Sequence, residues 1–221
     1  MSIAYGLAVP GASAAPGGID TSGLGRGLAD PVHDSQRLFR GLLTALAHPG
    51  RAVTLATSSE GSGAPEGPRP LDPATTAAAL TLLDGDTPLW IDWIADTPPL
   101  RAYLQFHCGC PIVERSQMAA FALVTDPANM PRLALFAQGS DQYPDRAATL
   151  LLQVPALVGG PAVTLSGPGI RDTAEIAPAG LPEWFWNDWR LNAAQFPLGV
   201  DIFLTCGAAV IGLPRSILAE G

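Results

Sequence analysis

Helix-start signals and short apolar runs alternate along most of the chain, and this alternation restricts it to an α/β fold. Asp30-Pro31 and Asp72-Pro73 each predict a helix start, because proline already has the backbone angle of a first helical turn. The first predicted helix ends at Pro49-Gly50 and the second at Asp84-Gly85. Further helices are predicted over residues 98–107, 127–137 and 182–195, and strands over residues 52–57, 88–94, 119–124, 148–154, 162–166, 200–205 and 208–213.

Two pairs of predicted strands follow one another closely in the chain. Strands 200–205 and 208–213 flank Cys206-Gly207, which predicts a hairpin. Strands 148–154 and 162–166 are also expected to be neighbours, joined through the short segment between them. Helices interleaved with strands favour a layered α/β domain, and the two hairpins make part of its sheet antiparallel. We therefore expect a mixed sheet.

The first predicted helix has the spacing of an amphipathic core helix. Its large apolar side chains recur at helical intervals, at Leu38, Phe39, Leu42, Leu43 and Leu46. We expect the helix to pack into the core through these side chains.

The sequence divides into a tail and a domain. Residues 1–29 are mostly Gly, Ala, Ser and Pro with few large apolar side chains. Such a segment cannot bury enough surface to offset the entropy of ordering, so a flexible tail is predicted. Residues 30–221 show no internal repeat and are expected to form a single α/β domain.

The absence of lysine excludes two kinds of chemistry. All twelve basic side chains are arginine. A pyridoxal phosphate enzyme needs a lysine amine to hold the cofactor's aldehyde, and a nucleotide-binding P-loop needs a lysine on the terminal phosphates. We expect neither, and predict that the chain carries no pyridoxal phosphate.

Charge and hydropathy exclude further classes. A formal net charge of −8 makes nucleic acid an unfavourable partner, because that affinity depends on clustered basic side chains. No apolar run reaches the roughly 20 residues of a membrane-spanning helix, and the first residues lack the pattern of an export signal. Cysteines Cys108, Cys110 and Cys206 have no disulfide framework spacing and are expected to be reduced. These features together predict a cytoplasmic protein.

The segment His107-Cys108-Gly109-Cys110 contains side chains that bind zinc or iron elsewhere. Structural zinc sites need four ligands, usually paired two to four residues apart, and the chain has no second Cys/His cluster. We therefore expect no metal. A helix end with two small buried thiols is the preferred interpretation, although His107 is also a candidate acid–base catalyst because histidine titrates near neutrality.

Two other features suggest contacts between side chains or with a partner. Asp201 lies within an apolar run, where an unpaired carboxylate would be costly to bury, so we expect a partner such as Arg40 or Arg215. The predicted helix over 182–195 carries more aromatic surface than one core face can take. Trp184 and Trp186 are therefore candidates for a partner interface.

Several segments together resemble the PhnH family of phosphonate metabolism. They cover about residues 30 to 217 in the family's order, and the last is the most specific: Gln36-x-x-Phe39-Arg40-x-Leu42-Leu43-x-Ala45, Asp86-Thr87-Pro88-Leu89-Trp90, Leu104-x-Phe106-His107, and Phe196-Pro197-Leu198-Gly199-Val200-Asp201 through Leu204-Thr205-Cys206-Gly207 to Pro214-Arg215. The tail before residue 30 and the Cys-Gly-Cys after His107 depart from the family's pattern.

The resemblance implies a fold and a role. The implied fold is a three-layer α/β/α sandwich with a mixed sheet, similar to the large domain of pyridoxal phosphate transferases but without the cofactor. The implied role is that of a carbon–phosphorus lyase core-complex subunit, assembled in two copies with subunits G, I and J and acting with subunit L. That complex joins ATP and a phosphonate into ribose 1-phosphonate 5-triphosphate. The resemblance implies no catalytic residue in this chain.

Two alternatives to a mainly structural or regulatory subunit stay open. The chain could be a homodimer that binds a phosphonate or a nucleotide itself, with Arg40, Arg101, His107 or Arg215 as anion contacts, because arginine offers a planar fork of donors. The second alternative is a free-standing enzyme that uses His107 as its acid–base catalyst.

Overall fold

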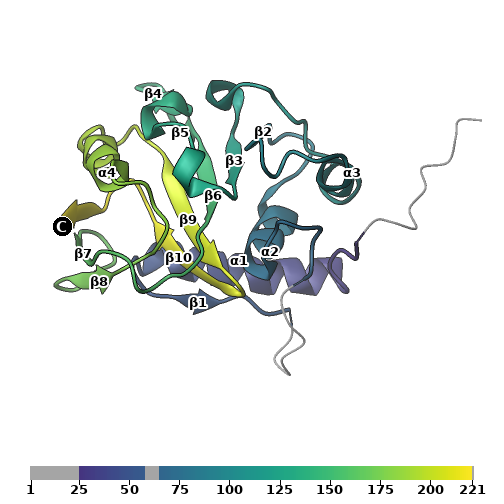
Figure 1. Cartoon of the computed structure of the whole chain (residues 1–221), viewed down its shortest axis with the longest axis horizontal. Coiled ribbons are helices and arrows are strands. Elements are labelled where there is room, and N and C mark those ends of the chain that lie inside the picture. Colours follow the sequence, from purple (N-terminus) through teal and green to yellow (C-terminus); the bar gives the residue numbers. More distant parts are fainter. Residues whose placement is uncertain (1–24, 58–64, 221) are drawn as a thin grey trace, which may run out of the picture.

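A computed structural model describes residues 25–57 and 65–220 of the chain (Figure 1). Residues 1–24 of the predicted flexible tail lie outside the described residues. The elements follow in the order α1 (Pro31–Ala47), β1 (Val53–Thr54), α2 (Pro73–Leu82), β2 (Leu89–Ile91), α3 (Pro98–His107), η2 (Ser116–Met118), β3 (Phe121–Val124), η3 (Pro127–Asn129), η4 (Leu133–Leu135), β4 (Gln138–Ser140), β5 (Tyr143–Ala147), β6 (Thr149–Gln153), β7 (Val163–Ser166), β8 (Ala174–Ile176), α4 (Phe185–Ala194), β9 (Asp201–Cys206), β10 (Ala209–Leu213) and β11 (Leu218–Glu220).

The central element is a six-stranded sheet in the order β1-β10-β9-β6-β3-β2. Strands β2, β3, β6 and β9 run parallel, whereas β10 is antiparallel to both of its neighbours, β9 and β1. The predicted α/β class with a mixed sheet is therefore confirmed, as is the hairpin formed by β9 and β10. Two smaller sheets accompany it, one with the order β11-β7-β8 and one formed by β4 and β5.

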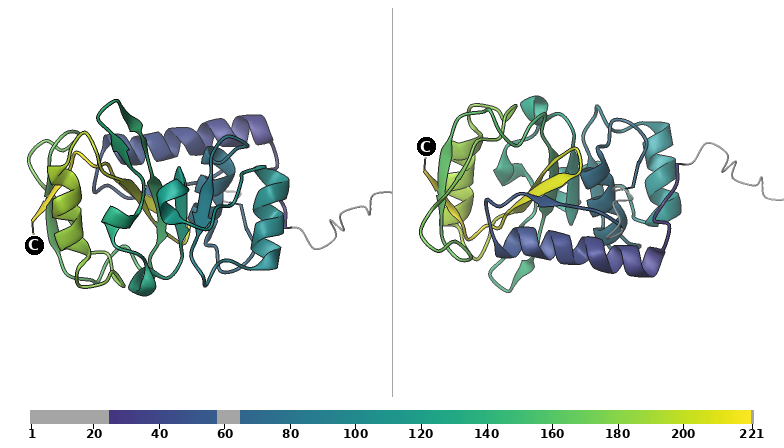
Figure 2. Two further views of the ribbon diagram at one scale, coloured as in Figure 1. Left: turned by 90° about the horizontal axis from the view of Figure 1, so that it is seen from above. Right: turned by 90° about the horizontal axis from the view of Figure 1, so that it is seen from below.

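Alternate residues of the central strands point to two separate cores. Leu123, Leu151 and Phe203 lie in one core, together with buried side chains of α1, α2 and α3. Their chain neighbours, such as Leu150 and Ile202, lie in the other, with side chains of α4, β7 and β11. Helices α1 to α3 thus cover one face of the sheet, and α4 with the β11-β7-β8 sheet covers the other (Figure 2).

The predicted helix over residues 127–137 is wrong. The structure has two single 3₁₀ turns there, η3 and η4, separated by Met130, Pro131 and Arg132. Pro131 has no backbone N–H to donate, and it forces Met130 into an extended conformation with φ −67° and ψ 151°. A continuous helix cannot pass this point.

The expected pairing of strands 148–154 and 162–166 is also wrong. Strand β6 lies between β3 and β9, whereas β7 lies between β11 and β8 in the small sheet. Consecutive residues Leu150, Leu151 and Leu152 are all buried, as in a central strand covered on both faces. Strand β7 alternates buried Val163 and Leu165 with exposed Thr164, which suits a sheet with one solvated face.

Helix α1 buries only part of its apolar surface. Leu38, Leu42 and Ala45 are buried against the sheet, but Phe39 is 50% exposed and Leu43 is 55% exposed. Each residue of a helix is turned about 100° from the one before it, so both side chains leave the buried face. The prediction that Phe39 and Leu43 enter the core is corrected accordingly. Within residues 25–57 and 65–220, no helix combines the length and the apolar character that crossing a bilayer demands.

Candidate functional site

A short strap, residues 25–29, runs from α3 to the start of α1. The Tyr103 hydroxyl donates to the Arg26 carbonyl at 3.0 Å, and His107 Nε2 lies 3.0 Å from the Gly25 carbonyl oxygen. A carbonyl only accepts, so Nε2 carries the proton. These residues belonged to the predicted tail, and their contacts instead hold the strap on α3.

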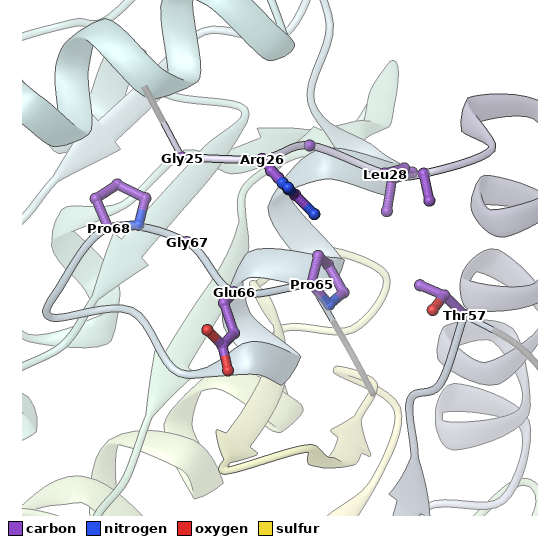
Figure 3. Close-up of a pocket in the computed structure, with 10 residues that line it drawn as sticks. Gly25, Arg26, Leu28, Thr57, Pro65, Glu66, Gly67 and Pro68 are labelled. Carbon is purple, nitrogen blue, oxygen red and sulfur yellow. The ribbon is translucent and has the colours of Figure 1, made fainter. Parts of the chain in front are cut away.

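A hollow lies beside this strap (Figure 3). Its volume is about 580 Å³, and it lies between the strap, Thr57 and the segment 65–68. Figure 3 shows the Arg26 guanidinium directed into this space and the Glu66 carboxylate turned away from it. The rest of the lining is mostly glycine, proline and backbone. The hollow therefore offers one cation to an anionic group, with few further polar side chains.

His107 lines a neighbouring hollow of about 340 Å³. Its ring packs against Tyr103, with ring centroids 4.5 Å apart, and its Nδ1 faces Gly27, where an added Cβ would come within 2.6 Å. One ring nitrogen is thus bonded to the strap and the other is covered by it. In this arrangement the imidazole anchors backbone through Nε2, and its Nδ1 lies beside Gly27.

The candidate arginines lie far apart in the fold and have different surroundings. Arg101, at the start of α3, donates two hydrogen bonds to the Asp96 carboxylate, one of them 2.7 Å long from Nη2. This contact keeps the pKa of Asp96 below its usual value. Arg40 is exposed on α1 and has no ion pair within the described residues.

Asp201 and Arg215 form the ion pair that the sequence analysis expected. The Arg215 backbone N–H donates to Asp201 Oδ1 at 2.8 Å, and its guanidinium binds both carboxylate oxygens. The same guanidinium donates to the Pro144 carbonyl at 2.9 Å. Arg215 therefore joins β9 to the β4–β5 hairpin, and its donors are used inside the protein.

A second carboxylate–arginine pair was not identified from the sequence. Asp188, buried on α4, accepts two hydrogen bonds from the Arg132 guanidinium and one from the Leu133 backbone N–H at 3.2 Å. The Arg132 contact holds the pKa of Asp188 below its usual value. A signal was present, because Asp188 lies between Phe185 and Trp189 on the buried face of its helix.

The two candidate interface tryptophans are partly buried. Trp184 packs beneath the Arg132 guanidinium, 4.7 Å from the ring centroid, and Trp186 meets Phe185 edge to face. Both rings also contact the core on the α4 side of the sheet. Trp186 lines a hollow of about 360 Å³ together with several prolines and Arg190.

The three cysteines are free thiols in apolar surroundings. Burial raises the pKa of Cys108 to about 12 and raises the pKa of Cys110 and Cys206 as well. Raised values disfavour the thiolate that a nucleophile or a metal ligand needs. Within the part of the chain that the structure describes, no three His, Cys, Asp or Glu side chains gather as metal ligands would.

Fold and site together define an α/β protein whose polar side chains mainly hold its own elements together. The family model described as "Bacterial phosphonate metabolism protein (PhnH)" matches residues 26–220. The chain is 40% identical over 192 residues to the protein of Rhizobium meliloti (strain 1021) named "Alpha-D-ribose 1-methylphosphonate 5-triphosphate synthase subunit PhnH", covering 87% of this chain and 93% of the relative. The chain belongs to the PhnH family of bacterial phosphonate metabolism proteins.

A second relative comes from Stutzerimonas stutzeri. It is named "Putative C-P lyase subunit protein HtxG" and is 31% identical over 181 residues, which are 82% of this chain and 83% of the relative. Both matches extend along most of the chain, so the family assignment does not depend on one local motif.

Proposed function

We propose that the chain is a subunit of a carbon–phosphorus lyase core complex. In this role it contributes, mainly structurally or as a regulator, to making ribose 1-phosphonate 5-triphosphate from ATP and a phosphonate. The observation that carries the proposal is the 40% identity, along nearly the full length of both chains, to a relative named as a synthase subunit.

The proposed partners are subunits G, I and J, two copies of each with two of this chain, and functionally subunit L. Without them the chain is proposed to form a homodimer. The three free cysteines suit a reducing compartment, and the proposed location is the cytoplasm. Neither nucleic acid nor a membrane is a proposed partner, in keeping with the net charge of −8.

The geometry supports a subunit that does not catalyse alone. Arg101 and Arg215 are paired with carboxylates, both nitrogens of His107 face the strap, and burial raises the pKa of all three thiols. A free-standing enzyme would need an accessible acid, base or nucleophile in a cavity. Among the candidate arginines, only Arg40 has no carboxylate partner in the described residues. It is therefore the only one of them left to bind a phosphonate or a nucleotide directly.

We further propose that residues 30–221 form one domain with a three-layer α/β/α architecture. Helices on one face of the central sheet and α4 on the other support this layering. The proposed relationship is to the large domain of pyridoxal phosphate transferases, without the cofactor. The absence of lysine from the chain supports the proposal that it carries no pyridoxal phosphate.

Co-purification tests the subunit proposal. The tagged chain is expressed with subunits G, I and J, and the recovered particle is sized by light scattering beside the isolated chain. A stoichiometric particle containing all four chains is expected. Recovery of the chain alone would overturn the proposal, and titration with ATP and methylphosphonate would then test direct ligand binding.

Trp184 and Trp186 remain proposed partner contacts. Replacing Trp186 with glutamate is expected to weaken recovery of the particle, because a charged side chain would take the place of the partly exposed ring that meets an apolar partner surface. An unchanged yield with an unchanged urea midpoint would remove α4 from the interface.

A further inference from the structure

The outer face of α1 carries an apolar stripe of three side chains, Val32, Phe39 and Leu43. They are 63%, 50% and 55% exposed. Seven and four residues separate them, so they line one side of the helix over about 16 Å. In both views of Figure 2, α1 runs along an edge of the molecule, and the β4–β5 hairpin projects past one end of the helix.

Arg40 borders this α1 stripe and gives it a charge. It follows Phe39 directly and lies three residues before Leu43, so its guanidinium can reach whatever covers the stripe. Arg37, the other arginine of α1, is engaged, since it pairs with Asp34. Within the described residues, Arg40 has no ion pair.

The α1 helix of a second copy of the chain fits this surface poorly. Asp34 is the only acidic residue of α1, and it is buried and bonded to Arg37. Packing α1 against its own copy would place two Arg40 side chains at the interface with no carboxylate from either helix. A partner that brings its own carboxylate would pair with Arg40, whereas an α1–α1 contact between two copies would leave Arg40 unpaired.

We infer that the α1 stripe is the docking surface for a different protein, which presents apolar side chains beside a carboxylate that pairs with Arg40. The inference rests on the proposed function, and the partner is another subunit of the same complex. Exposed apolar surface rimmed by charge is typical of such contacts, with aromatic side chains and arginine carrying much of the binding energy.

Charged replacements test the α1 stripe in the full chain, co-expressed with subunits G, I and J. Phe39→Asp and Leu43→Asp are each expected to weaken binding about 100-fold, because each introduces a charge into an apolar contact. Both side chains are exposed, so the urea midpoint of the isolated variant is expected to match that of the wild type. Phe106→Asp is the matched control, since Phe106 is a 56% exposed phenylalanine on another helix, and it should change binding less than threefold.

Substitutions of Arg40 test its proposed pairing with a carboxylate of the partner separately. Arg40→Glu is expected to weaken binding about tenfold or more, and Arg40→Lys much less, because lysine keeps the charge but loses the planar fork. Added salt should narrow the difference between the wild type and Arg40→Glu.

The outcomes separate the inference from the proposed function. If no multi-subunit particle is recovered with the wild-type chain, the proposed function fails. If the wild type assembles and Phe39→Asp assembles equally well, the docking surface is refuted while the subunit role stands. If Leu43→Asp lowers the mass of the isolated chain in light scattering, the face belongs to a second copy and the inference is overturned.

Discussion

Two adjacent threonines of α2 are equally buried but differ in their hydrogen bonds. Thr75 and Thr76 are both fully buried. The Thr75 hydroxyl bonds to Gln153 at 2.9 Å and to the Thr205 hydroxyl at 2.7 Å, whereas the Thr76 hydroxyl has no partner within the described residues. Valine has the same shape as threonine and no hydroxyl.

We expect opposite effects from the two threonine-to-valine replacements. Thr75→Val should lower the free energy of unfolding by about 1–3 kcal/mol, because it leaves its partners unpaired. Thr76→Val should leave that free energy unchanged or raise it by about 1 kcal/mol, because it removes an unsatisfied polar group. Urea unfolding of both variants checks this pair, and equal losses would contradict it.

Asp188 gives stability a defined dependence on pH. Its pKa in the folded protein is lowered, first by the hydrogen bonds from Arg132 and also by the Leu133 N–H. A lowered folded pKa contributes stability above the unfolded value, near 4, and this contribution is lost as pH falls through the folded pKa. Asp188→Asn should therefore cost about 2 kcal/mol at pH 7 and progressively less below about pH 4.

Urea unfolding of the wild type and Asp188→Asn across this pH range provides the measurement. Asp96→Asn is the control, because Asp96 also binds an arginine through two hydrogen bonds but lies at the surface, where such pairs contribute under about 1 kcal/mol. A constant difference between wild type and Asp188→Asn down to pH 2 would show that the carboxylate charge has no such role.

Residue-scale reasoning from the sequence succeeded where burial and charge conflicted openly. Asp201 lies in a continuous apolar run, so its need for a partner was visible, and Arg215 was one of two candidates. Asp188 has the same need, but the tryptophans around it drew the interpretation toward an interface. His107 was one candidate for a ligand contact, and no sequence pattern shows that its Nε2 bonds to the Gly25 carbonyl in the strap before α1.

At the scale of elements, the strap over α3 depends on a glycine. An added Cβ at Gly27 would lie 2.6 Å from His107 Nδ1 and 2.8 Å from its Cε1, closer than such atoms approach. Gly27→Ala should therefore loosen the strap and speed tryptic cleavage after Arg26 about tenfold, because cleavage follows the open population.

Mass spectrometry of the fragment that begins at residue 27 measures that cleavage. Gly85→Ala is the matched control, since an added Cβ there meets nothing within 4 Å. Identical cleavage rates for the two variants would mean that the strap does not depend on this contact.

The Asp201–Arg215 pair links three elements and predicts non-additive mutations. Arg215→Met leaves a partly buried carboxylate unpaired, and Asp201→Leu leaves the guanidinium unpaired, so each should cost about 3 kcal/mol. The double variant should cost clearly less than the sum of the two, because neither charge is then stranded. Urea unfolding of the four proteins forms the cycle, and simple additivity would argue against a coupled pair.

The sequence predicted elements best where local chemistry decides them. Proline starts α1, α2 and α3 as expected, and the β9–β10 hairpin follows its Cys206-Gly207 turn. Strands β4 and β5 were missed because Gln138–Ser140 and Tyr143–Ala147 have no apolar alternation. The predicted 127–137 helix does not form because Pro131 interrupts it.

At the scale of the whole molecule, the α/β class could be predicted but the strand order could not. Periodicity and turn residues report on neighbours in the chain, whereas strand order depends on which faces are buried by distant segments. Leu150 to Leu152 indicate a doubly covered strand without naming its neighbours. The same limit applies to the candidate residues. The family's motifs follow one another along the chain, but this does not place their residues in one cleft.

The position of β1 has a consequence for folding during synthesis. Val53 pairs with Val210, so an edge of the central sheet is completed by a strand made more than 150 residues later. The buried face of α1 also packs on β10, through the core that contains Leu38 and Val210. While the ribosome is still translating the middle of the chain, α1 lacks β10, the strand of the central sheet on which it packs. The segment from α1 to β1 must wait for the β9–β10 hairpin to emerge, and until then its buried face is open to chaperones and to misassembly.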